Sequence, residues 1–138
     1  MVDEEKQKEL QQKYMEFQML DQQIKQMQKQ LQMIESQLQE LNNTQESLDD
    51  LNKIKQGTDF LAPIASGIFV KGKLSENSEL LVNVGANVTV SKAVSEVKGM
   101  LATQIKELQE LQQNTAAQFQ MTTQKAVKLQ NELEKLVK

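Results

Sequence analysis

The feature that most constrains this chain is an apolar repeat of three and four residues that meets no helix breaker over residues 1–56. That stretch contains neither glycine nor proline, the two residues least compatible with a helix. With Leu10 at heptad position a, every a and d position from Phe17 to Leu41 is apolar, while the remaining positions are mostly Gln, Glu and Lys. Such a seam is typical of a coiled coil. Residues 1–56 are therefore predicted to form one long helix.

The same spacing returns in residues 92–138, where Gly99 is the only breaker. The predicted seam of this second helix comprises Val94, Val97, Leu101, Ile105, Leu108, Leu111, Thr115, Phe119, Thr122, Ala126, Leu129, Leu133 and Leu136. If residues 57–91 reverse the chain, the two seams bury each other with little loss of loop entropy. The predicted fold class is α+β: a long antiparallel two-helix coiled coil with two β-hairpins inserted between the helices. Residues 1–138 are expected to form a single domain.

Charges at the predicted helix ends agree with this arrangement. Acids begin the first helix and lysines gather near the end of the second, where each sign complements its own helix dipole. The residues concerned are Asp3, Glu4, Glu5, Lys125, Lys128, Lys135 and Lys138. Because antiparallel helices bring these ends together, the two groups should also attract each other.

Residues 57–91 have a different composition, rich in Val, Ile, Phe, Asn and Gly. Four short apolar runs predict strands at residues 59–64, 68–74, 79–85 and 88–91. The turn candidates are residues 65–67 and 85–87, since Gly and Asn tolerate positive φ. Pro63 cannot donate a ladder hydrogen bond, so its strand should lie at an edge. Two hairpins result.

Isolated hairpins are marginally stable in water, and these are strongly apolar. We expect the open strand edges to add to other chains, so that the hairpins act as an assembly platform. The assembly residues are predicted to be Phe60, Leu61, Ile64, Ile68, Phe69, Val70, Leu80, Leu81, Val82, Val84, Val88 and Val90. The alternative is a self-contained small sheet packed on the base of the coil against Leu51, Ile54 and Val94.

Composition excludes much chemistry. The sequence contains no Cys, His or Trp, and inspection finds no Arg, so thiolate nucleophiles, zinc sites, histidine catalysis and arginine phosphate clamps are absent. We therefore predict no enzyme activity, no cofactor and no metal. With 16 basic against 19 acidic residues, a net charge of −3 and no basic stripe, nucleic acid is not the expected ligand. No apolar run is long enough for a membrane span and no signal peptide is evident, so a cytoplasmic location is expected.

The order of helix, two hairpins and helix resembles an alpha-class prefoldin subunit. The likeness covers the whole sequence and is strongest in three segments, Phe60-Leu61-Ala62-Pro63-Ile64, Ile68-Phe69-Val70-Lys71-Gly72-Lys73-Leu74 and Val82-Asn83-Val84-Gly85. They are similar to that family's Leu-Val-Pro, Phe-x-x-Gly and Val-x-Val-Gly segments. Two hairpins instead of one indicate the alpha class. Ala62 stands where valine is usual, and Ala65 and Asn87 stand where glycine is expected, which leaves the turn types open.

The resemblance implies an ATP-independent holdase that captures unfolded proteins at coiled-coil tips and passes them to a group II chaperonin. It also implies a hexamer of two alpha-class and four beta-class subunits. Two subunit types suit an archaeon, whereas a eukaryotic complex has six distinct chains, and the sequence leaves the source open.

Apolar residues near the predicted tips are the client-binding candidates. Methionines outside the seam can adapt to varied apolar partners, and seam residues join them if the tip splays, which Lys13 and Thr122 at seam positions favour. The candidates are Leu10, Tyr14, Met15, Phe17, Met19, Leu20, Met121, Leu129, Leu133, Leu136 and Val137. The plainer interpretation is that surface methionines are merely tolerated helix formers. A structural coiled-coil scaffold or adaptor without client-holding activity is the alternative function.

Overall fold

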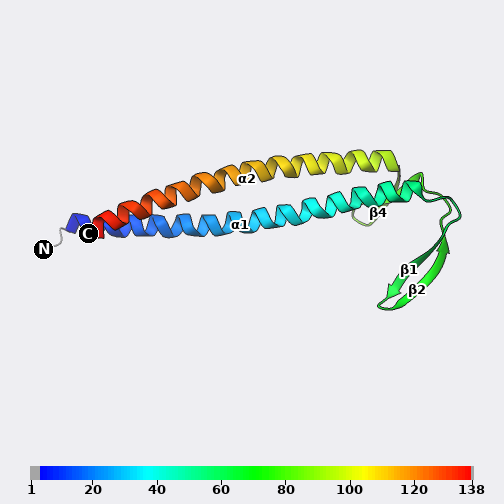
Figure 1. Cartoon of the computed structure of the whole chain (residues 1–138), viewed down its shortest axis with the longest axis horizontal. Helices are drawn as coiled ribbons and strands as arrows, with labels where there is room; N and C mark the ends of the chain where they lie inside the picture. The colour runs from blue at the N-terminus through cyan, green and yellow to red at the C-terminus, as the bar shows by residue number, and fades with distance from the viewer. Residues whose placement is uncertain (1–3, 138) are drawn as a thin grey trace. The chain divides into compact units, whose positions relative to one another are not determined.

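A computed structural model describes residues 4–137, which form two long helices with four strands between them (Figure 1). The helices are α1 (Glu4–Lys53) and α2 (Val94–Val137). The strands are β1 (Asp59–Ala65), β2 (Ile68–Lys73), β3 (Glu79–Gly85) and β4 (Val88–Ala93). The predicted elements are thus all present, and their ends coincide with the predicted ones or differ by at most three residues. Asp3 and Lys138, part of the predicted charge pattern, lie outside the described residues.

The chain divides into two compact units. Unit 1 comprises Met1–Gln37 with Leu108–Lys138, and unit 2 comprises Leu38–Glu107. In unit 1 the Lys13 ammonium lies 3.2 Å from the Glu132 carboxylate, and Gln112 donates a hydrogen bond of 3.1 Å to Glu35. In unit 2 Lys98 forms an ion pair with Asp49. Residue numbers therefore rise along α1 as they fall along α2, and the helices are antiparallel. The predicted fold class is confirmed, whereas a single domain of residues 1–138 stays a prediction.

The predicted seam of α1 is the buried face of that helix. All a and d positions from Leu10 to Leu48 are buried or half-buried, and the intervening positions are almost all exposed. The most completely buried of them are Ile34, Leu38 and Leu48. In the last turn burial passes from the predicted Asn52 to Leu51. A straight helix has 3.6 residues per turn, so a strict seven-residue repeat gradually drifts away from the buried face.

The seam of α2 is confirmed at most predicted positions and wrong at one. Leu111 is 50% exposed, and the neighbouring Gln112 is half-buried in its place. Spacings of four and three alternate without a break along residues 101, 105, 108, 112, 115, 119, 122 and 126, and Gln112 obeys them whereas Leu111 does not. Helix geometry therefore outweighs the polarity of a single side chain here. The half-buried Gln112 is tolerated because its side-chain amide donates a hydrogen bond to Glu35.

The four strands form two separate antiparallel hairpins, β1 with β2 and β3 with β4. Within residues 4–137 the strands therefore form no single closed sheet. Of the coil-base residues named in that alternative, Ile54 is 40% exposed, whereas Leu51 is half-buried and Val94 is buried, and most strand residues are exposed. Every strand has a free edge, so Pro63 lies on an edge strand as predicted.

Both predicted turns are confirmed. Their backbone angles explain why Ala65 and Asn87 can stand where glycine was expected. In the first turn, Ser66-Gly67, only Gly67 has a positive φ, at 77°. The second turn, Ala86-Asn87, has φ values of 50° and 60°, the combination of a type I′ hairpin turn. Asn tolerates this left-handed region, whereas Ala86 adopts it at an energetic cost.

The connection between the hairpins ties together the adjoining helix ends in unit 2. The Asn77 side-chain amide donates to the carbonyls of Leu51 at 3.3 Å and Ile54 at 2.7 Å. Carbonyls at a helix C-terminus have no partner within the helix, so this amide supplies one. The carbonyl of the next residue, Ser78, accepts a hydrogen bond of 3.1 Å from the Val94 amide at the start of α2. Polar side chains and backbone thus add to the apolar packing of Leu51 and Val94 at this junction.

We predict that Ala86→Gly stabilises the protein by about 1 kcal/mol, because a left-handed conformation costs an L-residue about 1–2 kcal/mol and glycine almost nothing. Chemical unfolding followed by circular dichroism would measure the change. Ala65→Gly is the matched control, since Ala65 borders the other turn without a positive φ. The control should lower stability, because glycine gains more entropy on unfolding. Equal losses in both variants would contradict the assigned turn.

Candidate functional site

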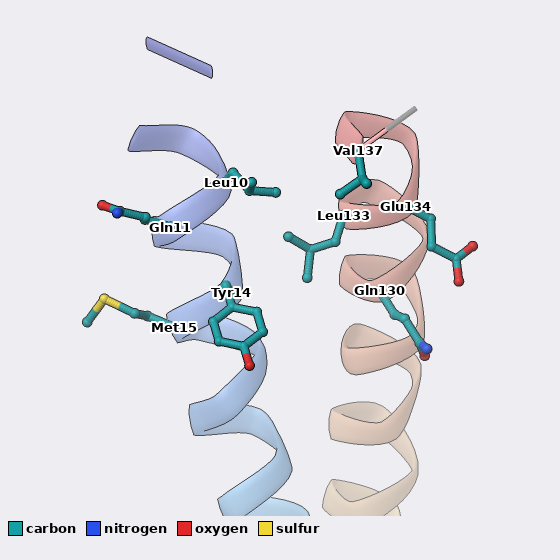
Figure 2. A pocket seen from close by; sticks show the side chains of 8 residues that line it. All are labelled: Leu10, Gln11, Tyr14, Met15, Gln130, Leu133, Glu134 and Val137. Carbon is teal, nitrogen blue, oxygen red and sulfur yellow. The ribbon is translucent and has the colours of Figure 1, made fainter. Parts of the chain in front are cut away.

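An open apolar groove lies between the first turns of α1 and the last turns of α2, within unit 1 (Figure 2). Its volume is about 760 Å³. The lining residues are Leu10, Gln11, Tyr14, Met15, Gln130, Leu133, Glu134 and Val137. We call this surface the end groove.

The end groove is built from four pairs of residues spaced four apart, which a helix places one above the other on a single face. Two apolar pairs, Leu10 with Tyr14 and Leu133 with Val137, form its centre, and Figure 2 shows Leu10 and Leu133 pointing toward each other across the helices. Gln11 with Met15 forms the α1 rim, and Gln130 with Glu134 forms the α2 rim. An apolar floor with polar edges is typical of a surface that binds apolar partners.

Five of the eleven predicted client-binding residues therefore meet in one place: Leu10, Tyr14, Met15, Leu133 and Val137. Four others, Phe17, Leu20, Leu129 and Leu136, belong to the seam and are buried or half-buried. Met19 is exposed and lines a second groove with Leu20 and Leu129, and Met121 is exposed and lines a third. Their predicted contact with clients stays a prediction.

Three groove residues are absent from the sequence-based set: Gln11, Gln130 and Glu134. All three are polar, whereas the sequence-based prediction rested on apolar side chains. The helical spacing is the signal that finds them, because Gln11 lies four residues before Met15, and Gln130 and Glu134 are separated by the same interval. The spacing of residues along a helix thus predicts which of them form the rim of a groove better than the hydrophobicity of each residue does.

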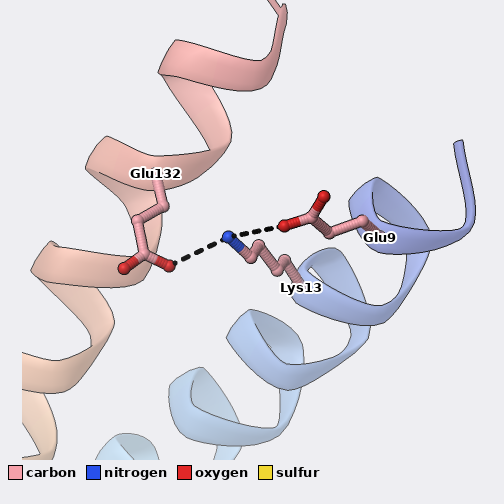
Figure 3. A network of polar contacts seen from close by, with 3 residues as sticks. All are labelled: Glu9, Lys13 and Glu132. Carbon is pink, nitrogen blue, oxygen red and sulfur yellow. Dashed lines mark ion pairs between the residues drawn. The ribbon is translucent and has the colours of Figure 1, made fainter. Parts of the chain in front are cut away.

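Lys13, half-buried at a d position beside the end groove, has its charge compensated from both helices (Figure 3). Its ammonium lies 3.3 Å from Glu9 on α1 and 3.2 Å from Glu132 on α2. The hydrogen bond with Glu132 raises the pKa of Lys13 above its ordinary value of 10.5, and the Glu9 carboxylate adds to this, although burial opposes it. Lys13 thus links the helices electrostatically, in addition to interrupting the apolar seam.

The two hairpins present a second candidate surface, in unit 2. Paired residues of neighbouring strands point to the same face, so the registers of Ala62 with Val70 and Val82 with Val90 give each hairpin an apolar face. On the opposite face of the second hairpin, Asn83 pairs with Thr89. All twelve predicted assembly residues lie on the strands, and ten are exposed, while Leu80 and Val82 are half-buried. Their role in assembly is not tested by the single chain.

The presence of glycine at position 72 of the first hairpin has a specific steric reason. It pairs with Phe60, and a Cβ atom at residue 72 would come within 2.7 Å of the tip of the Phe60 ring. Real Cβ contacts are not that short, so the missing side chain lets the ring lie across the strand pair. Glycine here shapes the apolar face instead of supplying a turn.

Neither a cluster of metal-ligating side chains nor a membrane-spanning helix is found within residues 4–137. Within residues 4–137 no three acidic, Cys or His side chains are grouped as metal ligands. Neither α1 nor α2, as far as the structure describes them, has a segment apolar enough to span a bilayer.

We predict that the Lys13 ion pairs make the coil less stable at high pH. A raised folded-state pKa means that the stabilisation is complete below pH 10.5 and is lost as the pH rises through the folded value. Thermal unfolding followed by circular dichroism should show a larger fall in Tm above pH 10.5 for the wild type than for Lys13→Met. Lys29→Met, which removes an exposed lysine of α1, is the control and should behave like the wild type. Identical pH profiles for all three proteins would refute the link.

Comparison with known proteins agrees with the fold and with the segments that suggested it. The family model for prefoldin subunits matches residues 20–138. The prefoldin subunit alpha of Nitrosopumilus maritimus is 36% identical over 80 residues, which cover 58% of this chain and 54% of that protein. The prefoldin subunit alpha of Archaeoglobus fulgidus is 26% identical over 127 residues, which cover 92% of this chain and 93% of the relative.

A solved structure shows the same fold. The cryo-EM structure of filamentous PFD from Methanocaldococcus jannaschii aligns with a TM-score of 0.62 at 19% identity, covering 88% of this chain and 94% of the other. The sequence matches span only part of some relatives, 54% of the Nitrosopumilus protein and 64% of the subunit from Methanococcus aeolicus. Since the family model nevertheless matches most of the chain, and the named relatives are archaeal alpha subunits, this chain belongs to the prefoldin family as an alpha-class subunit of the archaeal type.

Proposed function

We propose that the chain is a subunit of an ATP-independent chaperone that holds unfolded proteins in the end groove. The observation that supports this most strongly is the meeting of Leu10, Tyr14, Met15, Leu133 and Val137 on one open surface. Contiguous exposed apolar area marks an interaction site, whereas scattered apolar residues do not. Met15 and Tyr14 remain 63% and 55% exposed, so they are accessible without opening of the coil.

The chemistry of the groove suits a holdase. A holdase needs adaptable apolar contacts that form and break reversibly, and unbranched Met side chains supply them. The open shape of the groove allows extended segments of differing sequence to bind along it. Catalysis is not part of the proposal, because binding and release require no covalent step.

The hairpins are proposed to join this subunit to other prefoldin subunits, in a hexamer of two alpha-class and four beta-class chains. Each hairpin exposes an apolar face and two free strand edges, a combination that invites strand addition from another chain. Delivery of clients to a group II chaperonin and a cytoplasmic location complete the proposal, and both are supported by membership of the family alone.

The end groove is tested by replacing Met15 and Val137 with Glu in one double variant. A carboxylate facing an apolar client is costly to desolvate, by more than about 1.4 kcal/mol, so the capacity to suppress aggregation of a denatured protein should fall about tenfold. Light scattering without nucleotide measures this. Met33→Glu is the matched control, because Met33 is 63% exposed on α1, as Met15 is, and lines none of the three grooves described above. If the double variant suppresses aggregation as well as the wild type does, the end groove is not the client-binding site. If the chain is only a structural scaffold, the wild type itself will not suppress aggregation.

The assembly surface is tested by Val82→Lys combined with Val84→Lys. Val82 pairs with Val90 on the apolar face, and Val84 is an exposed apolar residue at the register shift between Asn83 and Gly85, so two charges there should prevent association with beta-class subunits. Native mass spectrometry of the mixed subunits measures the result. Thr89→Lys, on the opposite face of the same hairpin, should leave the hexamer intact. A hexamer formed by the double variant would contradict the assignment.

A further inference from the structure

The end groove has one charged lining residue, Glu134. Glu134 is exposed on the α2 rim and forms no ion pair with any residue in the range 4–137. The other acids nearby differ in this respect, because Glu132 and Glu9 both lie against Lys13 (Figure 3). Among the lining residues, the apolar surface therefore carries one carboxylate and no cation, and the charge of the nearby Lys13 is already compensated by Glu9 and Glu132.

The helix macrodipole does not favour a carboxylate at the position of Glu134. It lies in the last turn of α2, where the macrodipole is negative and favours cations over anions. The unpaired carbonyls of that turn add to the negative potential around its carboxylate. A cationic group that arrives with a ligand would reduce this repulsion.

The neighbouring grooves of unit 1 have a different charge. The second groove, between Glu16 and Glu132, contains Lys125 and Lys128 as well as those two acids and is neutral. The third groove, around Met27 and Met121, contains Lys125 alone and is positive. Of these three grooves of unit 1, the end groove alone has a negatively charged lining, and it also has the most apolar lining.

Tyr14 reinforces the preference for a cation. Its ring lies in the groove beside Leu10 and is more than half exposed (Figure 2). An ammonium or guanidinium group can stack on the face of an aromatic ring, whereas a carboxylate is repelled by it. Two independent features of the groove therefore favour the same sign of charge.

From this we propose that the end groove selects apolar client segments that contain a basic residue, and that Glu134 is the specificity-determining group. The proposal rests on the proposed holding function and narrows it to a class of ligand. A Lys or Arg beside the apolar anchors would pair with the Glu134 carboxylate while the anchors occupy the centre of the groove. Segments flanked by acidic residues would meet repulsion at the same rim.

The test uses fluorescently labelled amphipathic peptides that are identical except for one flanking Lys, Gln or Glu. Anisotropy with the full chain should give about threefold tighter binding for the Lys peptide than for the Glu peptide, the range of an exposed ion pair. High salt should remove most of this difference. Glu134→Gln should abolish it, and Glu134→Lys should reverse it. Glu110→Gln, which removes an exposed acid of α2 outside the three grooves, is the control and should preserve the preference.

The outcomes separate the two proposals. Charge selection is refuted if all three peptides bind with equal affinity, or if the Glu134→Lys variant still prefers the Lys peptide. In both cases the peptides bind, so the proposed holding function remains supported. If no peptide binds the wild type, both proposals fail. Reversal of the preference in Glu134→Lys alone would establish the assignment, since a structural effect of the substitution would weaken all three peptides together.

Discussion

The structure depends on the burial of two apolar seams against each other. Helices of 50 and 44 residues are too long and too polar on most faces to fold as separate globules, and each has only one apolar stripe. Buried and half-buried residues recur along both helices at intervals of three and four, from Leu10 to Leu48 on α1 and from Val94 to Leu136 on α2. Each helix uses its whole apolar stripe in the seam with the other helix. Little apolar surface of the helices therefore remains to cover the hairpins, and the hairpin faces stay exposed.

Polar contacts determine the register that the apolar seam alone leaves open. Leu and Ile side chains pack in several registers, but a cross-helix pair such as Lys13 with Glu132, or Gln112 with Glu35, forms in only one. The Asn77 amide adds a local constraint, because it binds carbonyls at the end of α1. Each of these interactions contributes only modestly to stability, so their main effect is to select one register of the two helices.

The two exposed apolar surfaces have different physical characters, and this suits them to different tasks. The hairpins present regular backbone edges, which pair with other strands in a defined register. The end groove presents flexible side chains on rigid helices and no free backbone edge, so it accepts varied partners. Assembly through one surface and capture through the other therefore need not compete. Family membership agrees with this division, which stays a proposal for the present chain.

Much of the fold follows from local pattern in the sequence. Heptad spacing, the absence of breakers before Gly57 and the turn residues of the middle segment predicted every helix and strand to within a few residues, because each depends on near neighbours. The same reasoning failed at Leu111, where a choice between adjacent residues depended on the phase of the entire helix and on Glu35, a residue 77 positions away from Gln112. The candidate site was predicted in part: sequence identified the apolar residues of the groove but not its rim of Gln11, Gln130 and Glu134. Which residues of α1 face which residues of α2, and hence where a groove opens and which charges remain unpaired, is set by the register between distant segments, and only the tertiary structure decides it.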